Sequence, residues 1–483
     1  MKLRTRLSAL AAAALVCAAG LTASLPQSAD AAISSEGTEF WLAFNSNQGS
    51  AWLTLYVAGA PGVTGTVEVP GQSLTYPFTI PPSQVAEVAL SLSVMMDPTR
   101  FHSTEPRAIH VTASADVTVY GLNQETSTAD AYLGLPVTAV GQRYRILDYQ
   151  GSGYQGWGYQ GAFIGVVPTA PGTTTFTITP PAALGRPAIT RTVDQGHVFQ
   201  YKIDSEESWT GTLVESDKPV SVFGGAQCAS VPRSNVGACD HLVEQMMPTS
   251  TWGKTFVTFP LSTSMRGDRF RIVADEDATK VQVQLLNTPP VTETLDAGEY
   301  YEFTTSEPTE IVADKPISVA QYYSDYSTSN HPADPFMVLV SPQEQGFTTS
   351  IFVSPLATTF TKHFVNIKVP TADTAGVTLD GTAVTGWTPI AASAFSAVTV
   401  EVTPGAHEVV APTLAQTIVY GFGSSASYGY PGGGKIAKIA TISQVTVDPD
   451  RTGRPGDKLC TTVTVKDSDD KPVESVNVDV AVT

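Results

Sequence analysis

Short apolar runs of alternating character recur along the whole chain. In most of them apolar and polar residues alternate, and the runs end at Pro, Gly, Asn or Asp. Alternation with a period of two predicts strands that bury one face, and the turn formers between them predict antiparallel sheets. Helical periodicity is almost absent, and only residues 84–97 leave room for one helical turn. The pattern therefore predicts an all-β protein.

One strand pattern returns four times at intervals of about 100 residues, which is the size of a domain rather than of a solenoid repeat. In each copy a polar segment precedes an alternating strand that ends at Gly or Gln. Two of these polar segments are Asp-Lys-Pro, and we interpret all four as turns. The copies cover residues 111–124, 213–227, 310–324 and 411–424, with central valines Val119, Val222, Val319 and Val419.

Other strands recur in the same order. Apolar segments at 40–44, 162–169, 269–276 and 363–373 are predicted to open each repeat, and a hairpin partner is expected after most of them. A chain of this length is too long for a single core. We therefore expect tandem antiparallel β-sandwich-like units, about four repeats of roughly 100 residues. Their approximate bounds are 32–142, 143–254, 255–350 and 351–435.

The two ends of the chain differ from its middle. A basic start, an Ala-rich apolar run and a final Ala-Asp-Ala predict a signal peptide over residues 1–31, in a style typical of bacteria. Near the other end, the glycines at 432–434 predict a linker. The segment VKDSDDKPVESVNVDV within residues 436–483 resembles part of a bacterial immunoglobulin-like domain. This segment is too short for a complete sandwich, so we expect further immunoglobulin-like domains after Thr483.

Charge and hydropathy limit the classes of partner. The net charge of −18 would repel phosphates and excludes a role at nucleic acids. Beyond the predicted signal peptide there is no run of about 18 apolar residues, so no membrane span is expected. These features predict a secreted, extracellular protein, with attachment to the cell wall as a further option.

Two of the four cysteines, Cys228 and Cys239, lie eleven positions apart. A zinc site usually needs four clustered ligands, and no second CxxC or HxxxH pair is present. A reactive thiol, such as a thioester to Gln245, would need an unpaired cysteine. In an exported protein a local pair fits a disulfide, and we expect this bond. Cys460 would then have a partner beyond Thr483 or be free and buried.

No cofactor or metal is expected. None of the acidic clusters matches the twelve-residue calcium loop with its terminal Glu. There is no HExxH, GxSxG or GxxxxGK[ST] motif. These absences, with seven histidines scattered singly, favour a protein that is not an enzyme.

The segment around the two cysteines resembles the N-terminal region of the IgG Fc-binding protein family. The resemblance extends from about residue 36 to residue 434 through the segments 36–44, 267–275 and 427–433 and the Asp-Lys-Pro strands. It implies interactions with Fc and mucus, and so an extracellular protein or glycan partner. The matching residues are Cys228, Val231, Pro232, Cys239, Asp240, His241, Leu242, Glu244, Gln245 and Pro248.

Two short segments carry candidate chemistry. Asp240, His241 and Glu244 could in principle form an acid–base set. We interpret them, together with Gln245, as a structural motif that ties the connector after the disulfide to the sheet.

The other segment, 148–163, alternates aromatic residues with glycines. Aromatic side chains on a loop suit the capture of sugars or proteins, because they offer a large contact area at a low entropy cost. The alternative is an aromatic flap that packs on a neighbouring unit. The candidate binding residues are Tyr149, Tyr154, Trp157 and Tyr159.

Together these features predict a non-catalytic binding or adhesion protein. It would recognise an extracellular glycoprotein of a host, of mucus or of a neighbouring cell, or an immunoglobulin, through loops on rigid β-sandwich units. One alternative is a structural stalk or matrix component. Another is a polysaccharide hydrolase, which would need a cleft that holds two carboxylates.

Overall fold

The computed structural model describes most of residues 34–433, together with two strands at 442–447 and 463–467. Residues Ile33–Thr483 form one compact unit, separate from Met1–Ala32. In the described part of the chain, no helix is long and apolar enough to cross a membrane. The gaps within 34–433 are 48, 50, 153–160, 204–205, 233–238, 263, 265, 286–287, 325–333 and 391–392.

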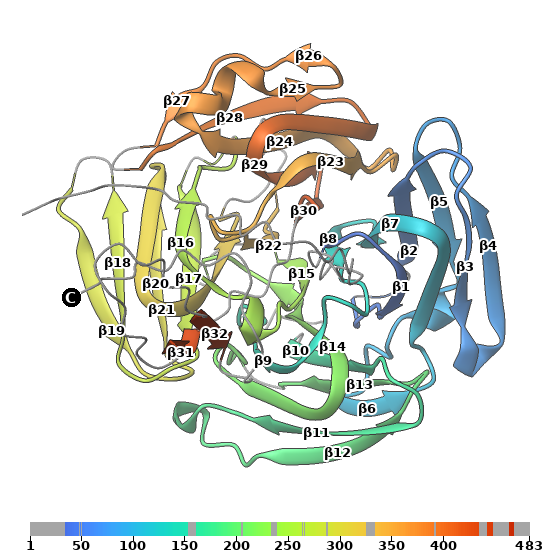
Figure 1. The fold of residues 1–483 in the computed structure, drawn as a ribbon. Helices are drawn as coiled ribbons and strands as arrows, with labels where there is room; N and C mark the ends of the chain where they lie inside the picture. Colours follow the sequence, from blue (N-terminus) through green and yellow to red (C-terminus); the bar gives the residue numbers. More distant parts are fainter. Residues whose placement is uncertain are drawn as a thin grey trace, which may run out of the picture. The chain divides into compact units, whose positions relative to one another are not determined.

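The described chain is almost entirely β-structure, as predicted. It contains four antiparallel sheets of seven, eight, seven and eight strands, here called the first to fourth sheets (Figure 1). Residues 84–97, where the sequence left room for one helical turn, contain the short 3-10 helix η2. The 3-10 helices are η1 (Pro70–Gln72), η2 (Leu92–Val94), η3 (Ala182–Leu184), η4 (Thr249–Thr251) and η5 (Thr371–Gly376).

Each sheet is organised around one long strand that contains a central valine of the repeat. All four valines are fully buried, which explains why this position is apolar in every copy. The predicted fourfold repeat is therefore a repeat of sheets. The long strands are β7 (Ile109–Glu125), β14 (Leu213–Ala229), β21 (Thr309–Tyr322) and β29 (Gly405–Gly423).

The first half of each long strand pairs with one strand on either side. On one side lie β1 (Gly37–Leu42), β9 (Gly141–Arg145), β16 (Gly253–Thr258) and β23 (Phe347–Ser354). On the other lie β3 (Thr64–Val69), β11 (Thr173–Thr179), β18 (Thr279–Leu285) and β25 (Thr378–Leu379). These last four strands pair in turn with β4 (Leu74–Thr79), β12 (Ile189–Asp194), β19 (Val291–Leu295) and β26 (Thr382–Ala383).

The second half pairs in the same way with two further sets of strands. One set is β2 (Trp52–Gly59), β10 (Ala162–Pro168), β17 (Asp268–Ala274) and β24 (Phe360–Pro370). The other set is β8 (Thr128–Gly134), β15 (Asp240–Gln245), β22 (Met337–Val340) and β30 (Ser427–Pro431). The outer partners of the first set are β5 (Val85–Leu90), β13 (Val198–Lys202), β20 (Tyr300–Thr305) and β28 (Phe395–Val402).

The interpretation of Asp-Lys-Pro as a turn was wrong. Residues 217–219 lie inside β14 and residues 314–316 lie inside β21, so both segments are bends within a continuous strand. In β14 the pairing register with β9 shifts between Glu215 and Val220. Proline lacks an N–H and is tolerated in a strand at such a bulge. The bend lets one strand belong to both halves of its sheet.

The predicted order of strands also needs a correction. Residues 40–44 were taken as the equivalent of 162–169, but β1 pairs with the first half of β7, as β9 does with β14. The equivalent of β10 is β2. Neither β1 and β2 nor β10 and β11 form the expected hairpin, because all four pair with the long strand of their sheet instead. Alternation predicts a strand but not its partner, since the partner lies far along the chain.

The sheets share buried surface. One apolar cluster joins Tyr120 and Leu122 of the first sheet to Val409 and Tyr430 of the fourth. A second cluster joins the core of the second sheet to Met337 and other residues of the third. The four sheets therefore pack against their neighbours through continuous cores.

Residues after 441 contribute one strand pair to the described structure. β31 (Ile442–Val447) and β32 (Val463–Asp467) pair antiparallel in a separate two-stranded sheet. They lie in the segment where the sequence predicts the start of an immunoglobulin-like domain, and that assignment stays a prediction.

Candidate functional site

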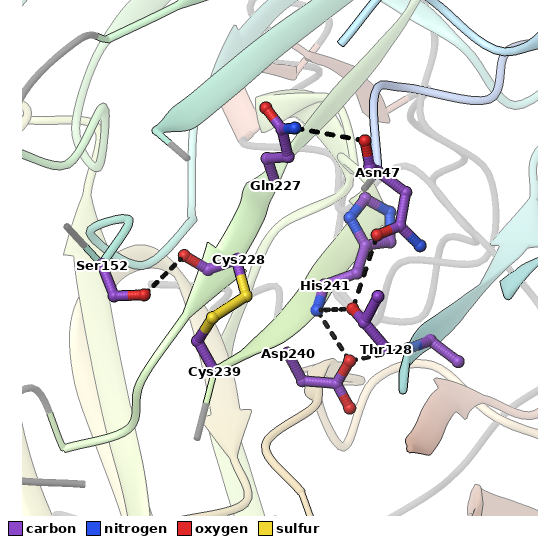
Figure 2. The surroundings of a disulfide bond; sticks show 9 residues. Asn47, Thr128, Ser152, Gln227, Cys228, Cys239, Asp240 and His241 are labelled. Carbon is purple, nitrogen blue, oxygen red and sulfur yellow. Dashed lines mark hydrogen bonds between the residues drawn. A yellow bond between two sulfur atoms is a disulfide. The ribbon is translucent and has the colours of Figure 1, made fainter. Parts of the chain in front are cut away.

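Cys228 and Cys239 form a disulfide, with their Cα atoms 5.2 Å apart, and the predicted bond is confirmed. Figure 2 shows that it links the end of β14 to the residue that precedes β15. The backbone N–H of Ser152 donates to the Cys228 carbonyl at 2.9 Å, and its hydroxyl donates to the same oxygen at 3.3 Å. The disulfide therefore fixes the start of β15 and also contacts the chain that enters the predicted aromatic loop.

Asp240 begins β15 and joins three strands. Its Oδ1 accepts hydrogen bonds from the backbone N–H of Ala129 in β8, at 2.6 Å, and of His241, at 2.8 Å (Figure 2). Its Oδ2 accepts from the backbone N–H of Ser427 in β30, at 3.2 Å. These are the contacts of a structural tie between β8, β15 and β30.

Asp130 of β8 makes an even wider set of contacts. Its carboxylate accepts hydrogen bonds from backbone N–H groups on four strands, all of them buried. The donors are Ala131 in β8 at 2.9 Å, Val243 in β15 at 3.1 Å, Met337 in β22 at 3.3 Å and Gly429 in β30 at 3.1 Å. Asp130 was not among the residues predicted from the sequence, although a single acidic residue in a strand of small and apolar residues is a usable signal.

Glu244 and Gln245 complete this arrangement. Glu244 Oε1 accepts from the Leu339 N–H in β22 at 3.2 Å, and Gln245 Oε1 accepts from the Leu135 N–H, just after β8, at 2.9 Å. Strand β8 contacts β15, β15 contacts β22, β22 contacts β30, and β30 contacts β8. We call these four strands the central ring, because side chains from β8 and β15 link them into a closed circle.

The carboxyl groups of the central ring are strongly affected by burial. Burial raises the pKa of Asp130, Asp240 and Glu244 well above the usual range, while the backbone donors act in the opposite direction. Asp334, whose charge also acts on Asp240, has its pKa raised by burial to about 7. The ring therefore concentrates acidic groups whose protonation is coupled to folding.

His241 does not form an acid–base pair with Asp240. Asp240 binds the backbone N–H of His241, whereas the imidazole stacks on Phe163 with ring centroids 5.8 Å apart. Its Nε2 lies 3.4 Å from the amide nitrogen of Asn123. Burial lowers the pKa of His241 to about 3, so its imidazole is neutral at physiological pH. A catalytic base needs access to a substrate proton, and the imidazole of His241 has no such access because it is fully buried.

A separate recess lies between the second and third sheets. This cleft has a volume of about 640 Å³, and we call it the Arg271 cleft after the side chain at its base. Gln150, Ser208 and Thr210 line it from the side of the second sheet. The third sheet contributes Arg271 from β17, Leu295 from the end of β19, and Glu299, Tyr300 and Glu302 at and within β20. The remaining lining residues are Pro181, Ala183, Leu184, Glu206, Glu207 and Gly298.

Arg271 is held rigidly although it carries a charge, and only 2% of its surface is exposed. Its Nη1 donates to the Asp148 carbonyl at 2.9 Å and to the hydroxyls of Ser208 and Thr210. Its Nη2 donates to Gln150 Oε1, and its Nε donates to Glu302. These bonds connect β17 to the segments around 148 and 208, so they give the cleft a pre-organised base.

Aromatic rings enclose the same guanidinium. Its central carbon lies 4.2 Å from the ring centroid of Tyr149 and 4.9 Å from that of Tyr300. Tyr300 is 42% exposed and presents an aromatic ring to the cleft. The sequence analysis missed this residue, because its exposure depends on how the second and third sheets meet.

Tyr149 itself is buried, with 1% of its surface exposed, and packs on Tyr322 of the third sheet. At this position the structure shows the packing that the sequence analysis gave as the alternative to binding. Tyr154, Trp157 and Tyr159 lie outside the described residues, so their role stays a prediction.

The lining of the Arg271 cleft is acidic, with four glutamates and one arginine. Glu302 binds both Arg269 and Arg271. Glu207 binds Arg186 at 2.9 Å, and Glu299 accepts a hydrogen bond from the Asp296 N–H at 2.9 Å. Among the described residues, no group of three or more His, Cys, Asp or Glu side chains is placed to hold a metal ion. With Arg186 and Arg269 included as ion-pair partners, four glutamates stand against three arginines, so the lining keeps a small net negative charge that suits a cationic or hydroxyl-rich surface.

Comparison with known proteins places the chain in a family. The sequence model of the family described as "IgGFc binding protein" matches residues 130–421, which is more than half of the chain. The chain belongs to the IgGFc-binding protein family. The matched region includes the disulfide, the Arg271 cleft, most of β8, and β15 and β22 of the central ring, whereas β30 lies beyond it. The resemblance seen in the sequence is confirmed.

One curated relative in this family is the IgGFc-binding protein of Homo sapiens. It is 26% identical to this chain over 337 residues, which are 66% of the chain. The same region is only 6% of the human protein. A solved structure of the tetra-tandem repeat in the extending region of a large adhesion protein aligns with a TM-score of 0.08 and 12% identity, over 77% of this chain and 92% of that one. A likeness that low carries no argument about fold or function.

Proposed function

We propose that this chain is a secreted binding module of the IgGFc-binding family that recognises an extracellular glycoprotein without covalent chemistry. The family and the name of the human relative support binding to a protein ligand. The disulfide supports an oxidising compartment outside the cytosol. The ligand class includes immunoglobulin, mucus glycoproteins, and the surface proteins of a host or a neighbouring cell.

The observation that carries this proposal is the construction of the Arg271 cleft. A pre-organised base lowers the entropy cost of binding, because few side chains must be ordered when the ligand arrives. Tyr300 adds exposed aromatic area beside polar groups, which is typical of residues that dominate binding energy. The rest of the module acts as a rigid frame, since the central ring connects all four sheets.

A polysaccharide hydrolase is the second candidate, because four carboxylates line the cleft. These carboxylates already make structural contacts: Glu302 binds two arginines, Glu207 binds Arg186, and Glu299 accepts a backbone N–H. These contacts favour structural and recognition roles for the carboxylates over proton transfer. Release of reducing ends from cell-wall glycans by the purified chain would support the hydrolase. The third possibility, a stalk, predicts neither binding nor turnover.

A binding screen tests the proposal. The oxidised full chain is immobilised and exposed to immunoglobulin Fc, mucins, matrix proteins and cell-wall glycans. Saturable binding that drops by about tenfold or more in Tyr300→Ala, equivalent to about 1.4 kcal/mol, would support the Arg271 cleft as the site. A variant with Tyr154, Trp157 and Tyr159 changed to Ala tests the predicted aromatic loop in parallel. The absence of binding across the whole panel would contradict the proposed function.

A further inference from the structure

The four sheets have equivalent strands, but they differ in whether a further strand pairs with the outer edge of β5, β13, β20 or β28. In the second sheet, β13 carries one more strand, β6 (His102–Glu105), which reaches it from the chain between β5 and β7 (Figure 1). In the fourth sheet, β28 carries β27 (Thr388–Pro389). Among the residues that the structure describes, no strand pairs with the outer edge of β5 or of β20. The fold thus accepts an added strand at this position and leaves it open twice.

The backbone of β20 can be assigned residue by residue. The Ala274 N–H donates to the Glu299 carbonyl at 3.2 Å at the end of the β17–β20 ladder. Bonded and non-bonded pairs alternate along an antiparallel ladder. The N–H groups of Tyr301 and Phe303 therefore point to β17, and those of Glu302 and Thr304 point to the outer edge. Strand β19 approaches this edge without pairing with it.

The Arg271 cleft opens beside the start of this edge. Glu299, Tyr300 and Glu302 line the cleft, and Thr304 lies further along the same strand and is exposed. Across the cleft lie Glu206 and Glu207. An extended segment on this edge would satisfy the outward backbone groups of β20 while its side chains meet four glutamates. Ion pairs with Arg186, Arg269 and Arg271 balance part of their charge and leave the surface weakly negative.

We propose that the free edge of β20 binds an extended peptide segment with basic side chains, which joins the third sheet antiparallel as β6 joins the second. This inference rests on the proposed function, namely that the chain binds a protein. Backbone pairing would provide affinity, and the glutamates would select lysine or arginine at alternate positions of the ligand.

The first sheet provides a matched control within the same chain. The Gly59 N–H donates to the Gln84 carbonyl at 3.0 Å, so Glu87 and Ala89 of β5 point outward as Glu302 and Thr304 do. A recess of about 540 Å³ also lies at β5, but Glu87 is the one acidic residue among those that line it. The two edges therefore share backbone geometry and differ in the number of glutamates beside them.

Three labelled peptides of about nine residues probe the β20 edge by fluorescence anisotropy on the full chain. The first alternates Lys with Val and Thr. The second carries Glu in place of Lys. The third is the Lys peptide with methyl groups on alternate backbone nitrogens, which remove the donors that strand pairing requires. We expect saturable binding of the first peptide, and at least about tenfold weaker binding of the other two, equivalent to about 1.4 kcal/mol.

Two proline variants locate the binding edge. Thr304→Pro removes an outward N–H without affecting the ladder to β17, and proline is tolerated at such an edge position. We expect it to weaken the Lys peptide by at least about tenfold, whereas Ala89→Pro in β5 leaves binding unchanged. Circular dichroism and the melting temperature check that both variants fold. If Thr304→Pro does not fold, the methylated peptide still provides the test.

The outcomes separate this inference from the proposed function. Equal binding of the methylated peptide, equal binding of the Glu peptide, or unchanged binding by a folded Thr304→Pro variant would each overturn strand addition at β20. If Fc or mucin binds the chain and the Lys peptide does not, the inference fails while the proposed function stands. If the Lys peptide binds and depends on Thr304, but the whole panel of proteins and glycans fails, the β20 edge is supported and the proposed ligand class is wrong.

Discussion

At the scale of single residues, Asp130 connects all four strands of the central ring. Its two oxygens accept four backbone N–H groups that belong to four strands, and three of those strands come from other parts of the chain. A buried carboxylate is expensive unless donors surround it, and here the donors are backbone groups that would otherwise be left unsatisfied. One residue therefore stabilises the centre of the molecule.

Replacing Asp130 should be more damaging than replacing an apolar residue of similar size. We expect Asp130→Ala to lower the free energy of unfolding by at least about 4 kcal/mol, because several buried N–H groups lose their acceptor. Asp130→Asn should also destabilise, since one end of the amide is a donor. Urea unfolding measures both. Asp116→Asn, at an exposed position in β7, serves as the control with a change within about 0.5 kcal/mol. Equal effects at the two positions would contradict this role of Asp130.

Asp334 should make stability depend on pH near neutrality. Burial raises the pKa of its folded-state carboxyl from 3.8 to about 7. A raised folded pKa means that stability is fully present below the unfolded pKa and is lost as the pH rises through the folded pKa. We therefore expect a lower melting temperature at pH 8 than at pH 5. Asp130, Asp240 and Glu244, whose pKa values are also raised, act in the same direction.

The variant Asp334→Asn isolates this contribution. It should reduce the loss of stability between pH 5 and pH 8 by about 1–3 kcal/mol, and its stabilising effect should become smaller as the pH falls toward the unfolded pKa of 3.8. Melting curves of the variant and the wild type across this range provide the measurement. A parallel decline with pH in both proteins would show that Asp334 is not responsible.

At the scale of elements, the packing of β14 explains why two glycines follow its central valine, Val222. In β14, a Cβ on Gly225 would lie 1.9 Å from the Leu242 carbonyl oxygen, and a Cβ on Gly224 would lie 2.6 Å from the Leu147 carbonyl oxygen. These glycines let neighbouring backbones approach β14 closely. The first half of the same strand is more exposed and tolerates Asp-Lys-Pro. A single strand thus changes character where it bends.

Gly225→Ala should therefore destabilise the protein. The added methyl group meets backbone on β15, which cannot move as a flexible side chain can, and we expect a loss of about 2–3 kcal/mol. Thermal or urea unfolding measures the change. Glu215→Ala, in the exposed half of β14, is the comparison, with an expected loss below about 1 kcal/mol. A neutral Gly225→Ala would mean that β14 and β15 are less closely packed than described.

At the scale of the whole molecule, the sheets are not independent domains. The central ring connects β8, β15, β22 and β30, and continuous apolar clusters cross from sheet to sheet. Arg271 of the third sheet also binds the segments around Asp148 and Thr210. Each sheet therefore completes its burial and its hydrogen bonds with groups from its neighbours.

This connection predicts cooperative unfolding. Calorimetry of the full chain should show one main transition for residues 33–433, because opening any one sheet exposes ring donors and apolar surface of the others. Residues 255–350 expressed alone should lack a sharp transition. Four separate transitions, or a stable isolated sheet, would contradict the role that we assign to the central ring.

Much of this architecture can be read from the sequence alone. Alternating apolar positions indicate strands because burial on one face of a sheet has a period of two. The fourfold recurrence of Val119, Val222, Val319 and Val419 follows from the burial of equivalent positions. The disulfide follows from a close cysteine pair in a chain with a predicted signal peptide, and the residues around it are enough to suggest the family. All of these are local signals.

Only the tertiary structure decided which strands meet. Pairing depends on backbone hydrogen bonds between distant segments, and these backbone groups are nearly the same in every residue. For this reason residues 40–44 were misplaced in the predicted strand order, and Asp-Lys-Pro was predicted to be a turn. Asp130 and Tyr300 gained their roles for the same reason, because their partners lie on other sheets. The Arg271 cleft exists only where two sheets come together, and the free edge of β20 depends on which strands of the third sheet pair. No local pattern records either of them.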